Sequence, residues 1–389
     1  MMSAMSVVAP ARHPETLAAM VDDSLVLMSP RDRRLHELNN SARAVWERLE
    51  PGATVGEIVS EVAENFEVSA SAIRDDIHRL IDRLRGDGLV TDDLRQSDFT
   101  RPVRARNLIR ADHQLTVRAL DAVVGIAVDD AELADALAPI LKPLMSTGEP
   151  TDEIVVTATR NHLYSLEMPG RTPVIVGSQV AAVLRIVGEL NTLAVESVPD
   201  HLVLHAGAVA TPAGGVLLPA PSNHGKSTLT AALVQRGHGY LTDEAAAVSA
   251  DLSLRPYPKA LALDPGSFEL FPEARPDHAG GSLSQAVQER EWHIDPARLG
   301  PVSGPCGASL VVSPSWTEGA ATTCTRLGPI DALHLLLGQS FEFGVDAQRA
   351  FTTLARVAET VPVFRLVYSD LSGGVAEIER RIDDRGFPG

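Results

Sequence analysis

Cysteine is almost absent from this sequence of 389 residues, which contains only Cys306 and Cys324. Neither cysteine belongs to a CxxC pair or stands beside a run of histidines, which argues against a disulfide framework and against a cysteine-based zinc site. The N-terminus lacks a basic segment followed by an apolar one, so we expect no secretory signal peptide. Together these absences predict a cytoplasmic protein.

The sequence also lacks long apolar runs and has fewer basic than acidic residues. No stretch approaches the ~18 consecutive apolar residues that cross a bilayer. The chain has 34 Lys+Arg against 51 Asp+Glu and a formal net charge of −17, whereas binding to nucleic acid requires clustered cations. We therefore expect neither a membrane nor a nucleic acid among the partners. Only three of the basic residues are lysines, namely Lys142, Lys226 and Lys259.

The remaining composition is typical of a globular protein, with 44% hydrophobic and 22% charged residues in a chain long enough for two or three domains. We expect an N-terminal extension at 1–22, a small domain at 23–93, a linker at 94–117 and a larger domain at 118–389. The linker is rich in arginine and lacks apolar periodicity, and a dedicated anion site is the alternative interpretation.

The small domain has the pattern of a hairpin followed by three helices. Strand-like segments at 24–29 and 35–38 flank a turn. Thr54 and Glu57 form the capping-box pattern of a helix start. A later apolar stripe ends at Gly86, which suits the left-handed position that closes a helix, and a short strand follows. This order predicts a small winged-helix-like α+β domain, whose mixed surface charge argues against DNA as its ligand.

The run from Asp22 to Val90 resembles the PqqD family in its HELN segment, in the Ala-Trp-Leu helix after it, and in the last helix before Gly-Leu-Val. Members of that family are peptide-chaperone modules that hold the leader peptide of a ribosomally made precursor against a maturation enzyme. The resemblance implies a precursor peptide and partner maturation enzymes as ligands. The leader would be added as a strand at the hairpin edge, near Leu25–Met28 and Leu35–Leu38.

The larger domain alternates strands and helices, which predicts an α/β fold. Its clearest motif lies between an apolar strand at Gly214–Pro219 and a helix that stops near Gly237. The loop between them matches the phosphate-binding pattern G-x-x-x-x-G-K-[ST], except that Ala220 stands at the first position; a chance GKS is the alternative. Backbone N–H groups at a helix N-terminus can surround a phosphate. The predicted ligands of ATP, or of another nucleoside triphosphate, are Ser222, Asn223, His224, Gly225, Lys226, Ser227 and Thr228.

Two carboxylates follow a short apolar strand downstream of this loop, Asp243 and Glu244. Neighbouring side chains of a strand face opposite sides, so one carboxylate can face a nucleotide-bound metal while the other takes a proton. In the same pattern Lys226 would reach the β- and γ-phosphates and Ser227 would ligate Mg²⁺. A simple acidic turn is the alternative interpretation.

The run from His205 to Glu244 resembles the HPr kinase/phosphorylase family, and especially the HPr-kinase-like serine kinases that occur with PqqD-type modules in peptide-modification gene clusters. The resemblance implies an α/β P-loop kinase domain of the HPr kinase/PEP carboxykinase type. Because HPr kinases are hexamers, it also implies a homo-oligomer. The residues that it assigns are a catalytic His205, Lys226 and Asp243, with Asp243 as the general base, and the metal ligands Ser227 and Glu244.

The sequence thus predicts a kinase that uses ATP and Mg²⁺ to phosphorylate a serine of a precursor peptide held by the small domain. Ala220 and Asn223 stand where the family has glycine, and Glu244 stands where it has aspartate. A catalytically degenerate peptide-binding scaffold is therefore one alternative, and a kinase of a small hydroxylated metabolite is another. Further candidates for phosphate contact or packing are Arg255, Lys259, Trp292 and His293.

Overall fold

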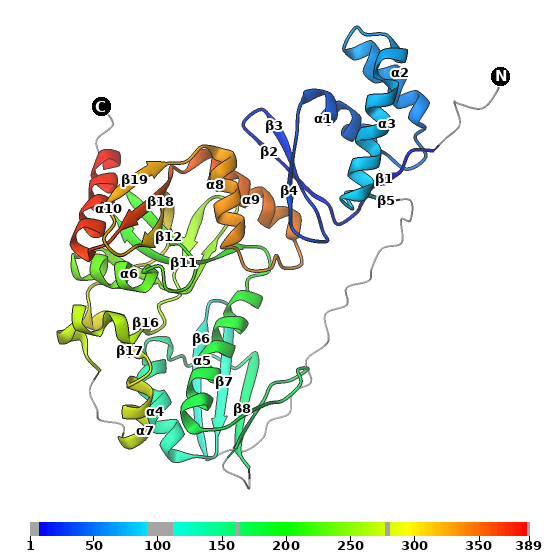
Figure 1. Cartoon of the computed structure of the whole chain (residues 1–389). Coiled ribbons are helices and arrows are strands. Elements are labelled where there is room, and N and C mark those ends of the chain that lie inside the picture. The colour runs from blue at the N-terminus through cyan, green and yellow to red at the C-terminus, as the bar shows by residue number, and fades with distance from the viewer. Residues whose placement is uncertain (1–7, 92–111, 160–162, 277–280, 387–389) are drawn as a thin grey trace. The chain divides into compact units, whose positions relative to one another are not determined.

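The computed structural model describes residues 8–91, 112–159, 163–276 and 281–386, and contacts divide the chain into two compact units, Met1–Thr100 and Arg101–Gly389 (Figure 1). Most of the expected linker lies outside the described residues, and its last part belongs to a strand that begins at His113. Each unit has its own hydrophobic core.

The first unit contains a three-stranded antiparallel sheet in the order β2-β3-β4, followed by three helices. The predicted hairpin is β3 and β4, and the predicted capping box of Thr54 and Glu57 is present at the start of α2. The last strand, β5, pairs with β1 instead of joining the sheet. The bounds are β1 Ala11–Arg12, β2 Leu17–Val21, β3 Ser24–Met28, β4 Leu35–Leu38, α1 Asn40–Glu47, α2 Val55–Asn65, α3 Ala70–Gly86 and β5 Val90–Thr91.

Two local features differ from the prediction. The segment expected as an extension supplies β2, because Leu17, Ala19 and Val21 alternate into the interior. Helix α3 includes Gly86, and the left-handed residue after it is Gly88, with φ of 72°. The N–H of Leu89 bonds to the carbonyl of Leu84 at 2.9 Å, which is the six-to-one bond of a Schellman motif.

The second unit begins with a five-stranded sheet in the order β10-β9-β8-β7-β6. Helices α4 and α5 share one hydrophobic core with this sheet. The bounds are β6 His113–Ala119, β7 Ala122–Val128, α4 Ala131–Leu141, η1 Lys142–Leu144, β8 Asp152–Ala158, β9 Tyr164–Glu167, β10 Val174–Val176 and α5 Gln179–Glu196.

The rest of the second unit is built on an eight-stranded mixed sheet in the order β12-β11-β14-β15-β18-β20-β19, with β13 also paired to β11. Because β12 pairs with β18 as well, five of these strands close into a ring. The first bounds are β11 Leu202–Thr211, β12 Gly214–Pro219, α6 Lys226–Gln235, β13 Gly239–Thr242, β14 Ala245–Val248, β15 Ser253–Arg255, β16 Leu261–Leu263, η2 Pro265–Leu270 and η3 Pro272–Ala274.

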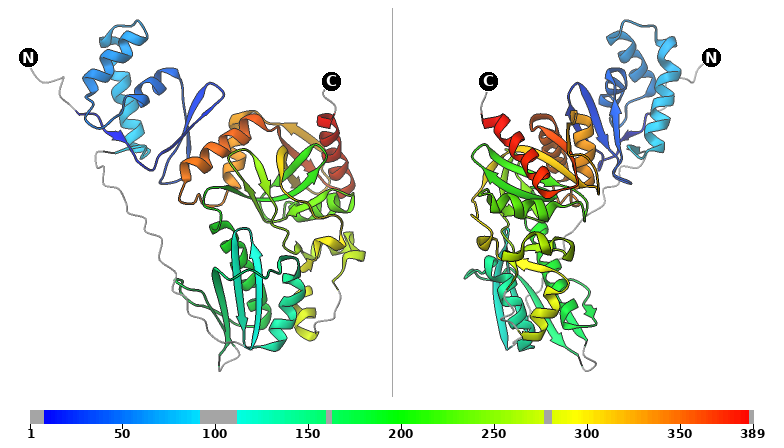
Figure 2. Two further views of the ribbon diagram at one scale, coloured as in Figure 1. Left: turned by 180° about the vertical axis from the view of Figure 1, so that it is seen from behind. Right: turned by 60° about the vertical axis from the view of Figure 1, so that its left-hand side comes forward.

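Helices cover this sheet: α6 lies beside α10, and α8 packs against α9, which contacts β11 (Figures 1 and 2). Among the residues with described positions, no helix combines the length and the apolar character that spanning a bilayer requires. The remaining bounds are α7 Gly281–Gln288, β17 Trp292–Ile294, η4 Pro296–Arg298, β18 Cys306–Trp316, β19 Thr323–Arg326, α8 Pro329–Gly338, α9 Ala347–Thr360, β20 Val363–Tyr368 and α10 Leu371–Gly386.

Three neighbouring strands of the sheet run parallel to one another. β12 pairs in parallel with β18, and β18 pairs in parallel with β20. Their carboxyl ends therefore meet at one edge of the sheet, which is where ligands bind in α/β proteins. The loop that carries the GKS motif leaves β12 at this edge.

Candidate functional site

The site is built around the loop between β12 and α6. Gly225 is the N-cap of α6, and no side chain caps this helix, whereas α1, α2, α4, α5 and α9 each have a capping side chain. The first N–H groups of a helix have no partner within the helix. The start of α6 therefore presents unsatisfied donors together with the positive end of the helix dipole.

The backbone of the loop explains why alanine fits its first position. The positive φ angles fall on Asn223, at 64°, and on Gly225, at 89°, whereas Ala220 has no positive φ and is fully buried. Asparagine is one of the few residues apart from glycine that adopts the left-handed conformation at little cost. Both departures from the usual glycines are thus compatible with the loop geometry.

Lys226 is a buried cation without a counter-ion in contact. Its side chain is almost fully buried and its Nζ donates to the carbonyl of Pro221 at 3.3 Å; within the described part of the chain it forms no ion pair. Burial lowers the pKa of Lys226, although the charges of Glu244, Asp243 and Asp264 oppose that shift. A buried charge is normally paired, so the arrangement suits an incoming anion.

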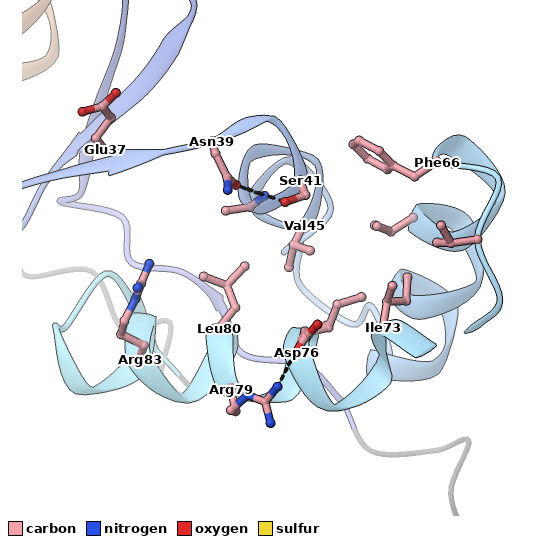
Figure 3. Close-up of a pocket in the computed structure, with 14 residues that line it drawn as sticks. Glu37, Asn39, Ser41, Val45, Phe66, Ile73, Asp76, Arg79, Leu80 and Arg83 are labelled. Atoms are coloured by element: carbon pink, nitrogen blue, oxygen red, sulfur yellow. Dashed lines mark hydrogen bonds and ion pairs between the residues drawn. The ribbon is translucent and has the colours of Figure 1, made fainter. Parts of the chain in front are cut away.

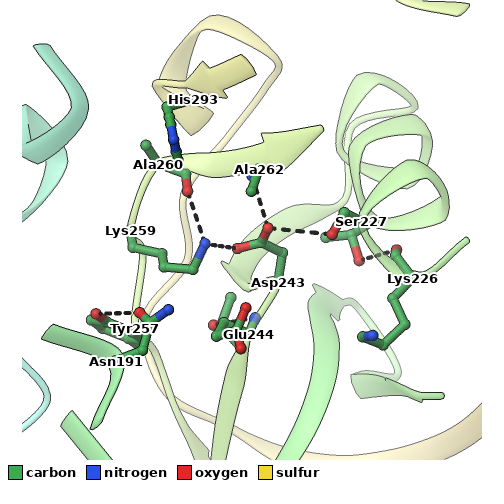
Figure 4. A network of polar contacts seen from close by, with 12 residues as sticks. Asn191, Lys226, Ser227, Asp243, Glu244, Tyr257, Lys259, Ala260, Ala262 and His293 are labelled. Carbon is green, nitrogen blue, oxygen red and sulfur yellow. Dashed lines mark hydrogen bonds and ion pairs between the residues drawn. The ribbon is translucent and has the colours of Figure 1, made fainter. Parts of the chain in front are cut away.

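Asp243 lies at the centre of a network in which both of its oxygens are occupied (Figure 4). Oδ1 accepts from the Tyr240 hydroxyl at 2.8 Å and pairs with Lys259 Nζ at 2.9 Å. Oδ2 accepts from the N–H of Ala262 at 2.9 Å and from Ser227 Oγ at 3.4 Å. Asp243 is therefore fixed in place and in contact with the serine of the GKS motif.

Glu244 occupies a more open position. Its side chain is 29% exposed, and Oε1 lies 3.3 Å from His205 Nδ1. Burial would raise the pKa of Glu244, but the hydrogen bond from His205 and the charges of Lys259 and Lys226 outweigh it, so the pKa lies below its ordinary value. His205 thus contacts Glu244 and not Asp243.

The donor set fits a nucleotide with its metal ion better than it fits a metal bound by the protein alone. Among the described residues, no three His, Cys, Asp or Glu side chains converge on a common point. Mg²⁺ that is bound with phosphates needs only one or two protein ligands. Ser227 and Asp243, which contact each other beside the uncapped helix, are suitable for that role.

The structure brings the other sequence candidates to different places. The Thr228 hydroxyl contacts Ser267 Oγ, outside the loop, at 2.8 Å. His224 Nδ1 lies 2.9 Å from the carbonyl of Ser222, within the loop itself. Arg255 pairs with Asp121 at 2.9 Å. Trp292 stacks on Phe268 and His293 lies beside Glu291, as packing residues do.

Lys259, a sequence candidate for phosphate contact, instead pairs with Asp243. Its side chain is 5% exposed. Burial would lower the pKa of Lys259, but the charges of Asp243 and Glu244 more than offset this effect and raise it. The sequence signal for Lys259 was the resemblance of its segment to the one that follows the acidic pair in HPr-kinase-like kinases.

We expect Lys259→Met to destabilise the second unit by about 3–5 kcal/mol, because the carboxylate of Asp243 would remain buried without its partner. The free energy of unfolding in urea measures this effect. Lys142→Met is the matched control: its side chain is 73% exposed and pairs with Asp295 at 3.2 Å, so the expected loss is below about 1 kcal/mol. Equal losses in the two variants would contradict the structural role of Lys259.

The first unit carries a groove of about 630 Å³ lined by residues from α1, α2, α3 and the segments next to them (Figure 3). Its apolar lining includes Val45, Phe66, Ile73 and Leu80, and Glu37 of β4 lies at its rim. Of the two strands expected to offer a free edge, β3 lies in the middle of its sheet, because it pairs with both β2 and β4. Among the described strands β4 pairs only with β3, so its other edge is open.

Comparisons with known proteins found a match to one family model and matches to solved structures. Residues 24–90 match the family model described as coenzyme PQQ synthesis protein D (PqqD). Among solved structures, the chain is similar to the Hpr(Ser) kinase/phosphatase from Coxiella burnetii, at 14% identity and a TM-score of 0.24, over 47% of this chain and 98% of that one. No curated protein matches the sequence.

Proposed function

We propose that this chain, which has a PqqD domain at residues 24–90, is a kinase that transfers a phosphoryl group from ATP, bound with Mg²⁺, to a serine hydroxyl of a ribosomally made precursor peptide. The observation that carries the proposal is the contact of 3.4 Å between Ser227 and Asp243 at the start of α6. In P-loop phosphotransferases, the loop serine and an aspartate at the end of a nearby strand together hold Mg²⁺.

The loop residues bind and orient the phosphates. The N–H groups at the start of α6 donate to phosphate oxygens, and the helix dipole favours the negative charge. Lys226 supplies the charge that the phosphates require, since it has no other counter-ion among the described residues. When bound beside Ser227 and Asp243, Mg²⁺ would supply charge neutralisation for the transferred group, so catalysis would depend mainly on positioning and electrostatics.

The contacts favour Glu244 as the base, whereas the resemblance to the HPr kinases implied that role for Asp243. Asp243 accepts four contacts through its two oxygens and is 2% exposed, so it suits a fixed position at the metal. Glu244 is ionised and partly exposed, and its described contact involves only Oε1. In this assignment Glu244 accepts the proton of the serine hydroxyl, and His205 holds Glu244 in position.

The first unit would recruit the peptide. The open edge of β4 provides main-chain donors and acceptors for an added strand, and the groove beside it accepts apolar side chains of that strand. The match to the PqqD family supports a peptide as the ligand of this unit.

The test is intact-mass spectrometry of the precursor peptide encoded next to the gene of this chain, after incubation with the full chain, ATP and Mg²⁺. We expect a gain of one phosphate, about 80 Da, on a serine. A peptide that binds the chain but gains no mass would support a peptide-binding scaffold. Phosphorylation of a small metabolite but not of the peptide would support the other alternative.

A substitution in the groove separates recruitment from chemistry. Phe66 is 43% exposed and lines the groove, so Phe66→Asp places a charge there at little cost to the fold. We expect the KM for the full precursor to rise about tenfold while kcat stays unchanged, because the lost contact is made equally in the ground state and the transition state. Val345→Asp, at a side chain that is 85% exposed and outside the groove, should change neither constant.

A further inference from the structure

Tyr368, a residue near the C-terminal end of the sequence, lies against the loop Ser222–Thr228. Tyr368 is the last residue of β20 and pairs in register with Trp316 of β18. Because β12, β18 and β20 run parallel, Tyr368 emerges at the same edge of the sheet as the loop Ser222–Thr228. Tyr368 as a whole is only 2% exposed.

The hydroxyl of Tyr368 lies directly against the loop. A Cβ placed on Gly225 would clash with the phenol oxygen, so that oxygen fills the space that the glycine leaves open. On its other side the ring packs against α10, where a Cβ on Gly374 would lie 2.8 Å from Cδ2. The ring is therefore held between α10 and the start of α6, and its hydroxyl points at the residue that caps α6.

This hydroxyl differs from those of the other three tyrosines in the chain. Tyr164 donates to Asp130 at 2.7 Å, Tyr240 to Asp243 at 2.8 Å and Tyr257 to Asn191 at 3.0 Å. The Tyr368 hydroxyl forms no hydrogen bond with any residue that the structure describes. The ring is buried but the hydroxyl oxygen is not sealed from solvent, so the hydroxyl is free to donate to a ligand that binds at the loop.

The charge state of the group suits a donor. Burial raises the pKa of Tyr368 to about 12, so the hydroxyl keeps its proton at neutral pH. A neutral phenol beside the N-terminus of α6 adds a donor to the N–H groups of the helix and places no negative charge next to Lys226. An anion bound at that point would receive hydrogen bonds from both sources.

We propose that the Tyr368 hydroxyl donates a hydrogen bond to a phosphate oxygen held by the loop Ser222–Thr228, and so positions the phosphates that ADP and ATP share. The inference rests on the nucleotide site proposed above and adds to it a residue that lies more than a hundred positions downstream of the motif. The phenol oxygen is also a second reason why position 225 requires glycine, in addition to the φ of 89°.

The test is calorimetric titration of the full chain with ADP and Mg²⁺. We expect Tyr368→Phe to weaken ADP binding about tenfold or more, because a hydrogen bond to a charged phosphate is lost. ATP should weaken by the same factor. The melting temperature without nucleotide should not fall, because the deleted hydroxyl has no hydrogen-bond partner among the described residues. A purely structural role would give the reverse, with a lower melting temperature and unchanged affinity.

The matched control is Tyr164→Phe, at a tyrosine of β9 in the five-stranded sheet, which deletes a hydroxyl bonded to Asp130. We expect this variant to melt at a lower temperature and to bind ADP like the wild-type chain. If Tyr368→Phe binds ADP like the wild type while Lys226→Ala binds it weakly, the inference on Tyr368 is wrong and the nucleotide site stands. If the wild-type chain binds no ADP, both proposals are wrong.

Discussion

Lys226→Ala is expected to abolish phosphoryl transfer to the precursor peptide, with a loss of at least about 1,000-fold in rate. The lysine is the only cation in the loop with no counter-ion among the described residues, and the transferred charge would have no substitute partner. The intact-mass assay measures the loss directly. Calorimetry with ATP and Mg²⁺ should show weaker binding in the same variant.

The fold should tolerate this substitution. Burial disfavours the charged form of Lys226, as its lowered pKa shows, so deleting the charge removes a cost from the folded state without nucleotide. We expect a melting temperature equal to or above that of the wild type, in contrast to the loss expected for Lys259→Met. A variant that keeps near-wild-type transfer would contradict the phosphate site.

The same shift predicts how ATP binding depends on pH. A lysine with a lowered pKa loses its proton at a lower pH than an ordinary lysine, whose value is 10.5. As the pH is raised, the affinity for ATP should therefore start to decrease before the pH reaches 10.5. Bound phosphate stabilises the charged form, so this fall should appear in the binding constant and not in the rate at saturating ATP.

Glu244→Gln is expected to lower kcat by about 100- to 10,000-fold, the range of a lost general base. The amide cannot accept the proton of the serine hydroxyl, whereas the metal-side pair of Ser227 and Asp243 is unchanged. ADP affinity should therefore stay near that of the wild type. Glu244→Asp, which keeps the carboxylate and shortens the side chain, should recover part of the rate.

The pH profile gives an independent check on this assignment. The pKa of Glu244 lies below its ordinary value of 4.5, so the base is ionised at neutral pH and is lost only as the pH falls through that lower value. Between about pH 5.5 and about pH 8, the rate should therefore not fall through protonation of Glu244. A wild-type rate in Glu244→Gln, or a full rate in the absence of both carboxylates, would contradict the role.

Asp243→Asn separates the two carboxylates. It removes the charge that Lys259 pairs with, so the second unit should lose stability, and it removes the metal-side oxygen, so ADP binding should lose its dependence on Mg²⁺. Glu244→Gln should do neither. If both variants behave alike, the division of roles between the two residues is wrong.

Several elements could be predicted from the sequence because their signals are local. The hairpin β3–β4 follows from strand-like segments around a turn, and α2 follows from the capping box of Thr54 and Glu57. Strand β2 was missed although Leu17, Ala19 and Val21 alternate, because a five-residue strand has little pattern of its own. Its place is settled by pairing with β3.

The loop Ala220–Thr228 was identified for the same reason, since strand, loop and helix are contiguous in the chain. By itself the sequence determined the GKS loop between a strand and a helix, the acidic pair and the hairpin and helices of the first unit. Each of these depends on residues within a few positions of one another, so the local sequence pattern is enough to predict it.

The tertiary structure decided the roles of the groups around that loop. Asp243 is saturated because Lys259 and the N–H of Ala262 fold back onto it, while Glu244 turns toward His205 of another strand. Tyr368 reaches Gly225 because two parallel pairings align three strand ends. Such contacts join distant parts of the chain, and only the packing of the sheet brings them within hydrogen-bond distance.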